Sequence, residues 1–216
     1  MSGIHKLYGR PGSGSAVCEA LLILTGLPHE LVDFGTWHRT APPPELVAVS
    51  PLAQVPVLVL PDGQTMTESA AIALHLADLM PQAELAPGLS DPLRPKYLRW
   101  MLYLATQNYP TALRFYYPER YTDELAGADS VKNSAQSRSA IEWSIFTDAL
   151  GEGPFMLGSK MSALDLYATM LASWDVEPKS LLARHHNLQR LCHAVARVPV
   201  LKDVSKRHWA CFTAAN

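Results

Sequence analysis

The sequence of 216 residues predicts an α/β domain followed by an all-helical domain. Residues 1–79 alternate short β-branched apolar runs with helix-like segments, which is the pattern of an α/β unit. Residues 80–92 are rich in proline and predict a linker. From residue 93 to 216, apolar side chains recur at helical spacing, so we expect a second domain made only of helices.

The composition restricts the class of protein. Hydrophobic residues make up 48% of the chain, charged residues 18%, and the net charge is −2, as in ordinary soluble domains. Lys and Arg form no cluster, so we expect no nucleic-acid partner. The most apolar run, residues 20–24, is far too short to span a membrane, and the first six residues do not resemble a secretion signal. Neither the three cysteines nor the eight histidines show metal-ligand spacing, so we expect no metal and a reduced, cytoplasmic protein.

The first half of the α/β domain reads as strand, helix, strand. Residues 6–8 form a short strand, and residues 16–25 follow with apolar side chains on one helical face until Gly26 ends the helix. Residues 30–34 resemble a second strand. Because a strand–helix–strand unit crosses over right-handedly, the two strands should be parallel. Residues 35–50 contain three consecutive prolines and predict an irregular connection with one helical turn.

The second half of this domain predicts a hairpin and a helix. Residues 57–60 form an apolar β-branched strand, and Pro61-Asp62-Gly63 is a turn signal. Thr65 and Met66 then pair back as the second arm. Helix formers begin at Ala70 and continue to residue 79. Strand, helix, strand, loop, hairpin, helix is the order of a thioredoxin-like domain.

Two features of residues 54–69 predict a ligand site. If the Val55–Pro56 bond is cis, the turn there leaves the N–H and C=O of Val55 unpaired and able to dock an extended peptide. Thr67-Glu68-Ser69 opens a helix, whose free N–H groups and positive dipole end suit a carboxylate. Glu68 can hold an ammonium group. A site that takes a peptide backbone, a carboxylate and an amine suits a small free peptide.

Gln54-Val55-Pro56, a hairpin, and Thr67-Glu68-Ser69 at a helix start resemble the glutathione-binding half of the glutathione S-transferase family. Ser162 and Asp165, spaced as a capping box at a helix start, resemble the N-capping motif of that family's helical domain. The resemblance thus covers essentially the whole chain. It implies a thioredoxin-like domain followed by an all-α domain, glutathione as co-substrate, and a homodimer.

The resemblance also implies site residues. Val55, Pro56, Thr67, Glu68 and Ser69 would bind glutathione, and His38 or Arg39 would contact its glycine carboxylate.

Catalysis in this family requires glutathione as the thiolate, which a hydroxyl just after the first strand can stabilise. Ser13 falls where serine-type members carry that hydroxyl, and Ser15 is the second candidate. Backbone N–H groups of the same loop are the third. Gly14 and Gly9 fall at or near the positions that hold cysteine and tyrosine in other members. Cys18, one turn into the helix, is interpreted as a structural thiol.

The helical domain predicts long helices over residues 93–110, with Pro110 kinking or ending the helix, and over 131–150. Further helices follow Ser162, around residues 188–195, and over 200–212. An aromatic-rich segment covers residues 103–121. One face of it, with Tyr103, Gln107 and Arg114, is a candidate pocket for an aromatic or anionic electrophile.

These observations predict an enzyme that activates the glutathione thiolate for attack on a small electrophile. Two alternatives remain open. One is another glutathione-dependent reaction, such as isomerisation, dehalogenation or peroxide reduction. The other is a glutathione transferase fold kept as a non-catalytic interaction module, since fold alone does not decide function.

Overall fold

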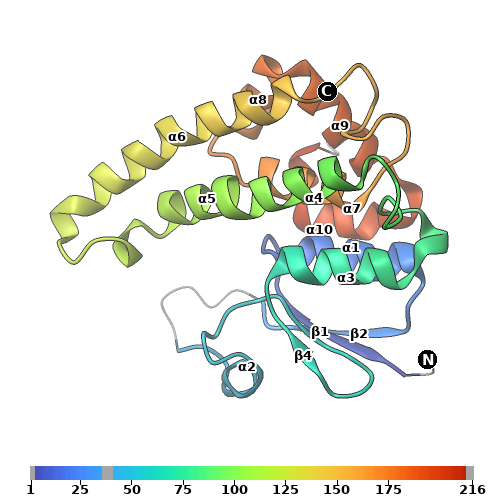
Figure 1. Ribbon diagram of the computed structural model, residues 1–216. Helices are drawn as coiled ribbons and strands as arrows, with labels where there is room; N and C mark the ends of the chain where they lie inside the picture. The colour runs from blue at the N-terminus through green and yellow to red at the C-terminus, as the bar shows by residue number, and fades with distance from the viewer. Residues whose placement is uncertain (1–2, 36–40, 213–216) are drawn as a thin grey trace.

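The computed structural model describes residues 3–35 and 41–212 of the chain. A four-stranded sheet lies beneath a helical domain, and helices α1 (Ser15–Thr25) and α3 (Ser69–Leu79) lie side by side between the two (Figure 1). The predicted fold class, an α/β domain followed by helices, is therefore confirmed. Among the described residues no helix is both long and apolar enough to cross a membrane.

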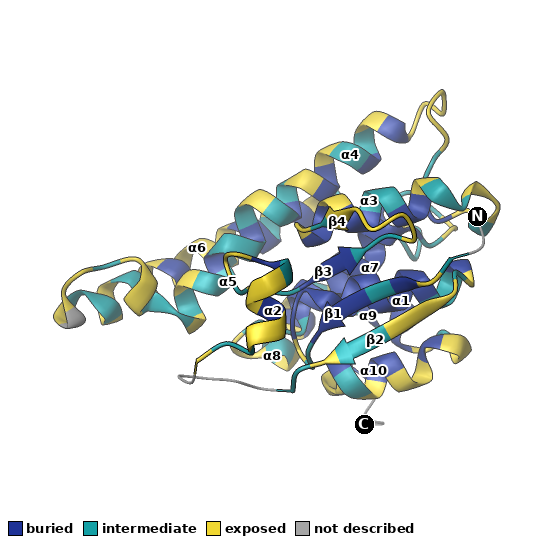
Figure 2. Ribbon diagram, turned by 90° about the horizontal axis from the view of Figure 1, so that it is seen from below, coloured by how far each residue is buried: buried dark blue, intermediate teal, exposed yellow. Residues whose placement is uncertain are grey.

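The sheet has the strand order β2-β1-β3-β4. Its strands are β1 (His5–Gly9), β2 (His29–Asp33), β3 (Val57–Val59) and β4 (Thr65–Met66). As predicted, β1 and β2 are parallel, and β3 and β4 form an antiparallel hairpin. Strand β3 also pairs antiparallel with β1, which makes the sheet mixed. The central strands β1 and β3 are mostly buried, whereas the edge strand β2 is largely exposed (Figure 2).

Alternate side chains of the central strands enter two different cores. Leu7 and Leu58 face α1 and α3 and belong to the main core. Tyr8 and Val57 face the other way and pack with Leu46 of the short helix α2 (Pro44–Val49). This alternation follows from the two-residue period of a strand. Because Tyr8 pairs with Val57, the start of β3 lies beside the end of β1, where the loop after β1 begins.

The helical domain contains seven α-helices within the described residues. In chain order they are α4 (Arg94–Tyr103), α5 (Tyr109–Tyr116), α6 (Ala128–Asp148), α7 (Ala163–Ala172), α8 (Pro178–Arg184), α9 (His186–Ala196) and α10 (Lys202–His208). Every residue of α7 is buried. Helix α7 packs against α1 and α3, so one apolar core runs through both domains.

The expected end or kink at Pro110 takes a different form. A π-helical turn (Leu104–Asn108) joins α4 to α5, and Pro110 lies in the first turn of α5. In the π turn Tyr109 donates its N–H to the carbonyl oxygen of Leu104, five residues back, and this change of hydrogen-bond register lets the helix pass a proline that has no N–H. The aromatic segment therefore continues as helix to Tyr116 instead of ending near residue 110.

The linker is anchored by a buried arginine that the sequence did not single out. Arg94 makes two hydrogen bonds of 2.7 Å to the carboxylate of Asp78 and one of 2.9 Å to the carbonyl oxygen of Pro87. These bonds join the end of α3 to the start of α4. The two-pronged geometry holds the proline-rich stretch in one conformation against the core.

The capping box at Ser162 and Asp165 is confirmed. The Asp165 carboxylate accepts hydrogen bonds from the N–H and the hydroxyl of Ser162, both at 2.8 Å. Its other oxygen accepts the N–H of Met156 at 2.9 Å. Since Asp165 is fully buried, this one side chain joins the preceding loop to the start of the central helix α7.

Candidate active site

A cavity of about 880 Å³ lies between the two domains. Its walls come from the loop after β1 (residues 10–14), residues 52–55 before β3, helix α5 with the turn after it, and residues 173–174 after α7. The N-terminus of α1 faces this space through Gly14, the residue before the helix. Cavities at such junctions, with a few polar groups among apolar walls, are the usual form of small-molecule sites.

Both candidate serines turn their hydroxyls towards the loop. The oxygens of Ser13 and Ser15 lie 2.9 and 3.1 Å from the carbonyl oxygen of Arg10, to which both donate, and 2.9 Å from each other. Ser13 lines the cavity, whereas Ser15 is fully buried and does not. The Ser15 oxygen also accepts the N–H of Arg10. In this geometry the two hydroxyls stabilise the loop after β1 through the carbonyl oxygen of Arg10.

The glycines at the two alternative catalytic positions lie in tight surroundings. A Cβ on Gly9 would lie 2.6 Å from the Ser15 hydroxyl oxygen. A Cβ on Gly14 would lie 2.7 Å from the hydroxyl of Tyr109 and 3.1 Å from Cδ of Pro56. Neither position has room for a side chain without movement of its neighbours.

The peptide-docking element has the predicted backbone. The Val55–Pro56 bond is cis, Val55 lines the cavity, and Pro56 is buried beside Gly14. Within the described part of the chain, no hydrogen bond uses the backbone N–H or C=O of Val55. Both groups are available to an extended ligand.

The start of α3 lies next to the same point. Ser69 has its Cβ 3.5 Å from the Cβ position of Gly14, and its hydroxyl lies 2.8 Å from the hydroxyl of Tyr167 on α7. Thr67 and Glu68 are exposed, and no side chain in the described residues caps the helix. Glu68 has a positive φ of 66°, a costly conformation for a residue other than glycine. The N–H groups of the first turn are therefore open to an anion.

The residues predicted for the electrophile pocket make other contacts. Tyr103 donates its hydroxyl to the carbonyl oxygen of Glu142, and Arg114 lies over the ring of Tyr121. Neither of them, nor Gln107, lines the cavity, while His38 and Arg39 lie outside the described residues. The positions of α5 that do line it are spaced for one helical face: Tyr109, Ala112, Leu113 and Tyr116. This spacing is visible in the sequence once the helical phase is counted from Tyr109, after the π turn.

Tyr109 lines the cavity, although the sequence pattern did not predict it as a pocket residue. Its ring packs edge-on against Trp174, with ring centroids 5.1 Å apart, and its hydroxyl stands over Gly14. Burial raises the pKa of Tyr109 well above its usual range, so the hydroxyl keeps its proton at neutral pH.

Cys18 matches its interpretation as a structural thiol. It is fully buried, and its sulfur lies 3.9 Å from the carbonyl oxygen of Gly14. Burial raises the pKa of this thiol, which suppresses the reactive thiolate. Across residues 3–35 and 41–212, no group of three or more His, Cys, Asp or Glu side chains has the geometry of a metal site.

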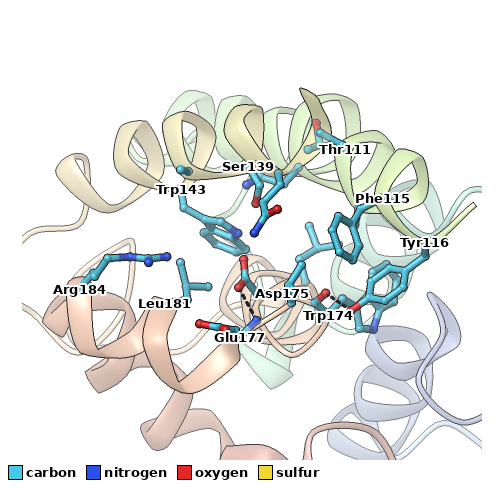
Figure 3. A pocket seen from close by; sticks show the side chains of 17 residues that line it. Thr111, Phe115, Tyr116, Ser139, Trp143, Trp174, Asp175, Glu177, Leu181 and Arg184 are labelled. Atoms are coloured by element: carbon cyan, nitrogen blue, oxygen red, sulfur yellow. Dashed lines mark hydrogen bonds between the residues drawn. The ribbon is translucent and has the colours of Figure 1, made fainter. Parts of the chain in front are cut away.

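A second cavity, of about 210 Å³, lies inside the helical domain among α5, α6 and α8 (Figure 3). Phe115, Trp143 and Leu181 form apolar walls. Two of its polar groups are already hydrogen-bonded within the protein. Asp175 accepts the N–H of Glu177, and the Tyr116 hydroxyl donates to the carbonyl oxygen of Trp174. Since Tyr116 and Trp174 also line the larger cavity, the two spaces share a wall.

Residues 15–79 match the model of the family described as "Glutathione S-transferase, N-terminal domain". The chain is 32% identical over 204 residues to the "Uncharacterized GST-like protein YncG" of Escherichia coli K12, covering 94% of this chain and 98% of that protein. The chain belongs to the glutathione S-transferase family.

Two further comparisons show what the chain is similar to. It is 24% identical to the glutathione S-transferase GstA of Escherichia coli O157:H7, over 92% of this chain and 96% of that one. A glutathione transferase homologue from Sulfitobacter, solved with bound glutathione, superposes with a TM-score of 0.84 at 20% identity, covering 94% of this chain and 97% of the other. At that identity the second likeness concerns the fold alone. The glutathione transferase fold thus accounts for both domains.

Proposed function

We propose that this protein is a glutathione transferase, which binds glutathione at the domain junction and adds its thiolate to a small electrophile. One observation carries the proposal: the unpaired backbone of Val55, the open start of α3 and the start of α1 all converge on Gly14. Each suits a different part of a small thiol peptide. The relatives named as glutathione transferases support the same conclusion.

The pose follows from the chemistry of each element. A carboxylate of glutathione lies at the N-terminus of α3, where free N–H groups and the helix dipole favour an anion. Glu68, exposed beside it, holds the ammonium group. Val55 pairs with the peptide backbone as a strand would. The thiol then lies at the start of α1, whose dipole stabilises the thiolate.

The electrophile would occupy the rest of the cavity. Its wall is apolar and aromatic at Leu113, Tyr116 and Trp174. Arg120, also on the lining, lies 4.1 Å from the ring centre of Tyr117 and brings positive charge to the rim. These walls suit a small aromatic substrate, including one that carries negative charge.

A non-catalytic interaction module is the second candidate. It is favoured by the two serine hydroxyls, which both bond to the carbonyl of Arg10 instead of entering the cavity. In that case glutathione would bind without activation of its thiol. Other glutathione-dependent reactions, namely isomerisation, dehalogenation and peroxide reduction, would need an activated thiol as well.

Replacing Glu68 with alanine should weaken glutathione binding about tenfold, because an ion pair with the ammonium group is lost. Isothermal calorimetry gives the affinity, and a chromogenic aromatic halide reports conjugation. Glu152→Ala, at another exposed glutamate, is the matched control and should change neither affinity nor melting temperature. Unchanged affinity in E68A removes Glu68 from the site. Absence of binding to the unaltered protein refutes the proposed function.

We further propose a cytoplasmic homodimer that uses the exposed apolar side chains of α4 and α6. Leu102, Ile141 and Ile145 are 52%, 53% and 44% exposed. We expect them to form one surface, because Leu102 and Ile141 each precede a residue of the hydrogen bond that joins Tyr103 of α4 to the carbonyl oxygen of Glu142 on α6. Burial of such a patch is the usual source of dimer stability.

The double substitution Ile141→Glu and Ile145→Glu should convert the dimer to a monomer at micromolar concentration, because two charges would be buried at the interface. Light scattering measures the mass. Leu89→Glu, at a linker side chain that is 86% exposed, is the control and should leave the mass unchanged. A monomer mass for the unaltered protein would contradict the proposed dimer.

A further inference from the structure

We propose that the hydroxyl of Tyr109, from the helical domain, is the hydrogen-bond donor that stabilises the glutathione thiolate. This inference rests on the proposed function, since it names the activating group of the same site. The hydroxyl oxygen lies 2.7 Å from the position that a Cβ on Gly14 would occupy, directly over the start of α1. A thiol placed at the start of α1 would therefore lie beside this hydroxyl.

The hydroxyl of Tyr109 has no hydrogen-bond partner among residues 3–35 and 41–212, although it lines the cavity. Its two tyrosine neighbours on the lining differ in this respect. Tyr116 donates to the carbonyl oxygen of Trp174 at 2.7 Å, and Tyr117 accepts from Arg10 at 3.2 Å. A phenol that is mostly enclosed needs an acceptor, and here a ligand can supply one.

The serines have no proton left to donate. Each hydroxyl carries one hydrogen. Ser13 and Ser15 each donate that hydrogen to the carbonyl oxygen of Arg10. A serine would have to break its hydrogen bond to the loop before it could donate a hydrogen bond to the sulfur. Tyr109 breaks no bond to do so.

The orientation of Tyr109 is set by packing. Its ring is held edge-on by Trp174, and its backbone lies in the first turn of α5, directly after the π turn. Functional sites often coincide with such π turns. Burial also keeps the hydroxyl protonated, so it acts as a donor across the pH range in which a thiol ionises.

The step balances without a further reactant. The glutathione thiol loses its proton to solvent, and the O–H of Tyr109 donates a hydrogen bond to the resulting S⁻ without transferring its own proton. The sulfur electron pair then forms the bond to the electrophilic carbon, and the leaving group departs with its bonding pair. Tyr109 thus lowers the pKa of the bound thiol.

The test is a titration of the thiolate absorbance of bound glutathione against pH. In the unaltered protein the bound thiol should have a pKa well below the free value of about 8.5. Tyr109→Phe should raise that pKa by at least about one and reduce turnover about tenfold near pH 6.5, with glutathione affinity changed less than about twofold at that pH, where most of the thiol is protonated. Tyr121→Phe, at a tyrosine off the cavity lining, is the matched control and should change neither value.

The outcomes separate this inference from the proposed function. If the unaltered protein binds glutathione with a lowered pKa and Y109F leaves it unchanged, Tyr109 is not the donor. If Ser13→Ala instead raises the pKa of the bound thiol, Ser13 is the hydrogen-bond donor. Binding without a lowered pKa refutes thiol activation and favours the interaction module, and no binding refutes both proposals. The titration is made at a temperature below the melting temperatures of all variants, so that a loss of stability in Y109F does not alter the pKa that is read.

Discussion

Replacing Asp165 with alanine should lower the free energy of unfolding by about 3–5 kcal/mol, because two buried backbone N–H groups lose their acceptor together with the helix cap. Those N–H groups belong to Met156 and Ser162. The effect should be large because α7, which Asp165 caps, is buried along its whole length and packs against α1 and α3. Chemical denaturation at pH 7, followed by circular dichroism, measures it.

The stability that D165A loses should be greater at acidic than at neutral pH. Burial raises the pKa of Asp165 to about 6, while its hydrogen bonds oppose that rise. Between about pH 4 and 6 the native state then binds a proton that the unfolded chain has released, so this group's contribution to stability decreases as pH rises through that window. D165A lacks this dependence, so its deficit should be greater at pH 5 than at pH 7. Asp148→Ala, at an exposed aspartate of α6, is the control and should cost less than about 0.5 kcal/mol.

The fold was predictable where the signal is local. Apolar strands of three to five residues, the turn at Pro61-Asp62-Gly63 and the capping box at Ser162 are each recorded in a few consecutive residues. The π turn before Tyr109 was not predictable in the same way, because residues 104–108 contain no glycine or proline to mark it and tertiary packing decides its hydrogen bonds. That turn shifts the helical phase, so the face of α5 that lines the cavity runs through Tyr109 and Tyr116 and not through Arg114.

The sequence predicts the backbone features of the candidate site, but not the side chains that surround them. The unpaired Val55 and the open start of α3 follow from the proline and from the segment Thr67-Glu68-Ser69. The side chains that complete the site come from distant parts of the chain: Tyr167, for example, meets Ser69 across 98 residues. No local pattern records such a contact, since only the packing of α7 on the first domain creates it.

His208, near the C-terminal end of α10, is a second side chain of this kind, and it holds the loop of the candidate site. Its Nδ1 accepts the N–H of Gly12 at 3.1 Å, and its Nε2 donates to the carboxylate of Glu19 on α1 at 2.9 Å. The side chain is 1% exposed. The imidazole therefore fixes Gly12, which lines the cavity at a φ of 63°, relative to α1.

Replacing His208 with alanine should lower the free energy of unfolding by about 2–3 kcal/mol, because the Gly12 N–H and the Glu19 carboxylate each lose a buried partner. It should also weaken glutathione affinity several-fold, because the loop at the start of α1 loses its anchor. His208→Gln, which can still accept from one side and donate to the other, should recover part of both losses. His186→Ala, at an exposed histidine, should change neither. If H208A lowers stability while affinity stays unchanged, His208 supports the fold but does not position the loop for glutathione.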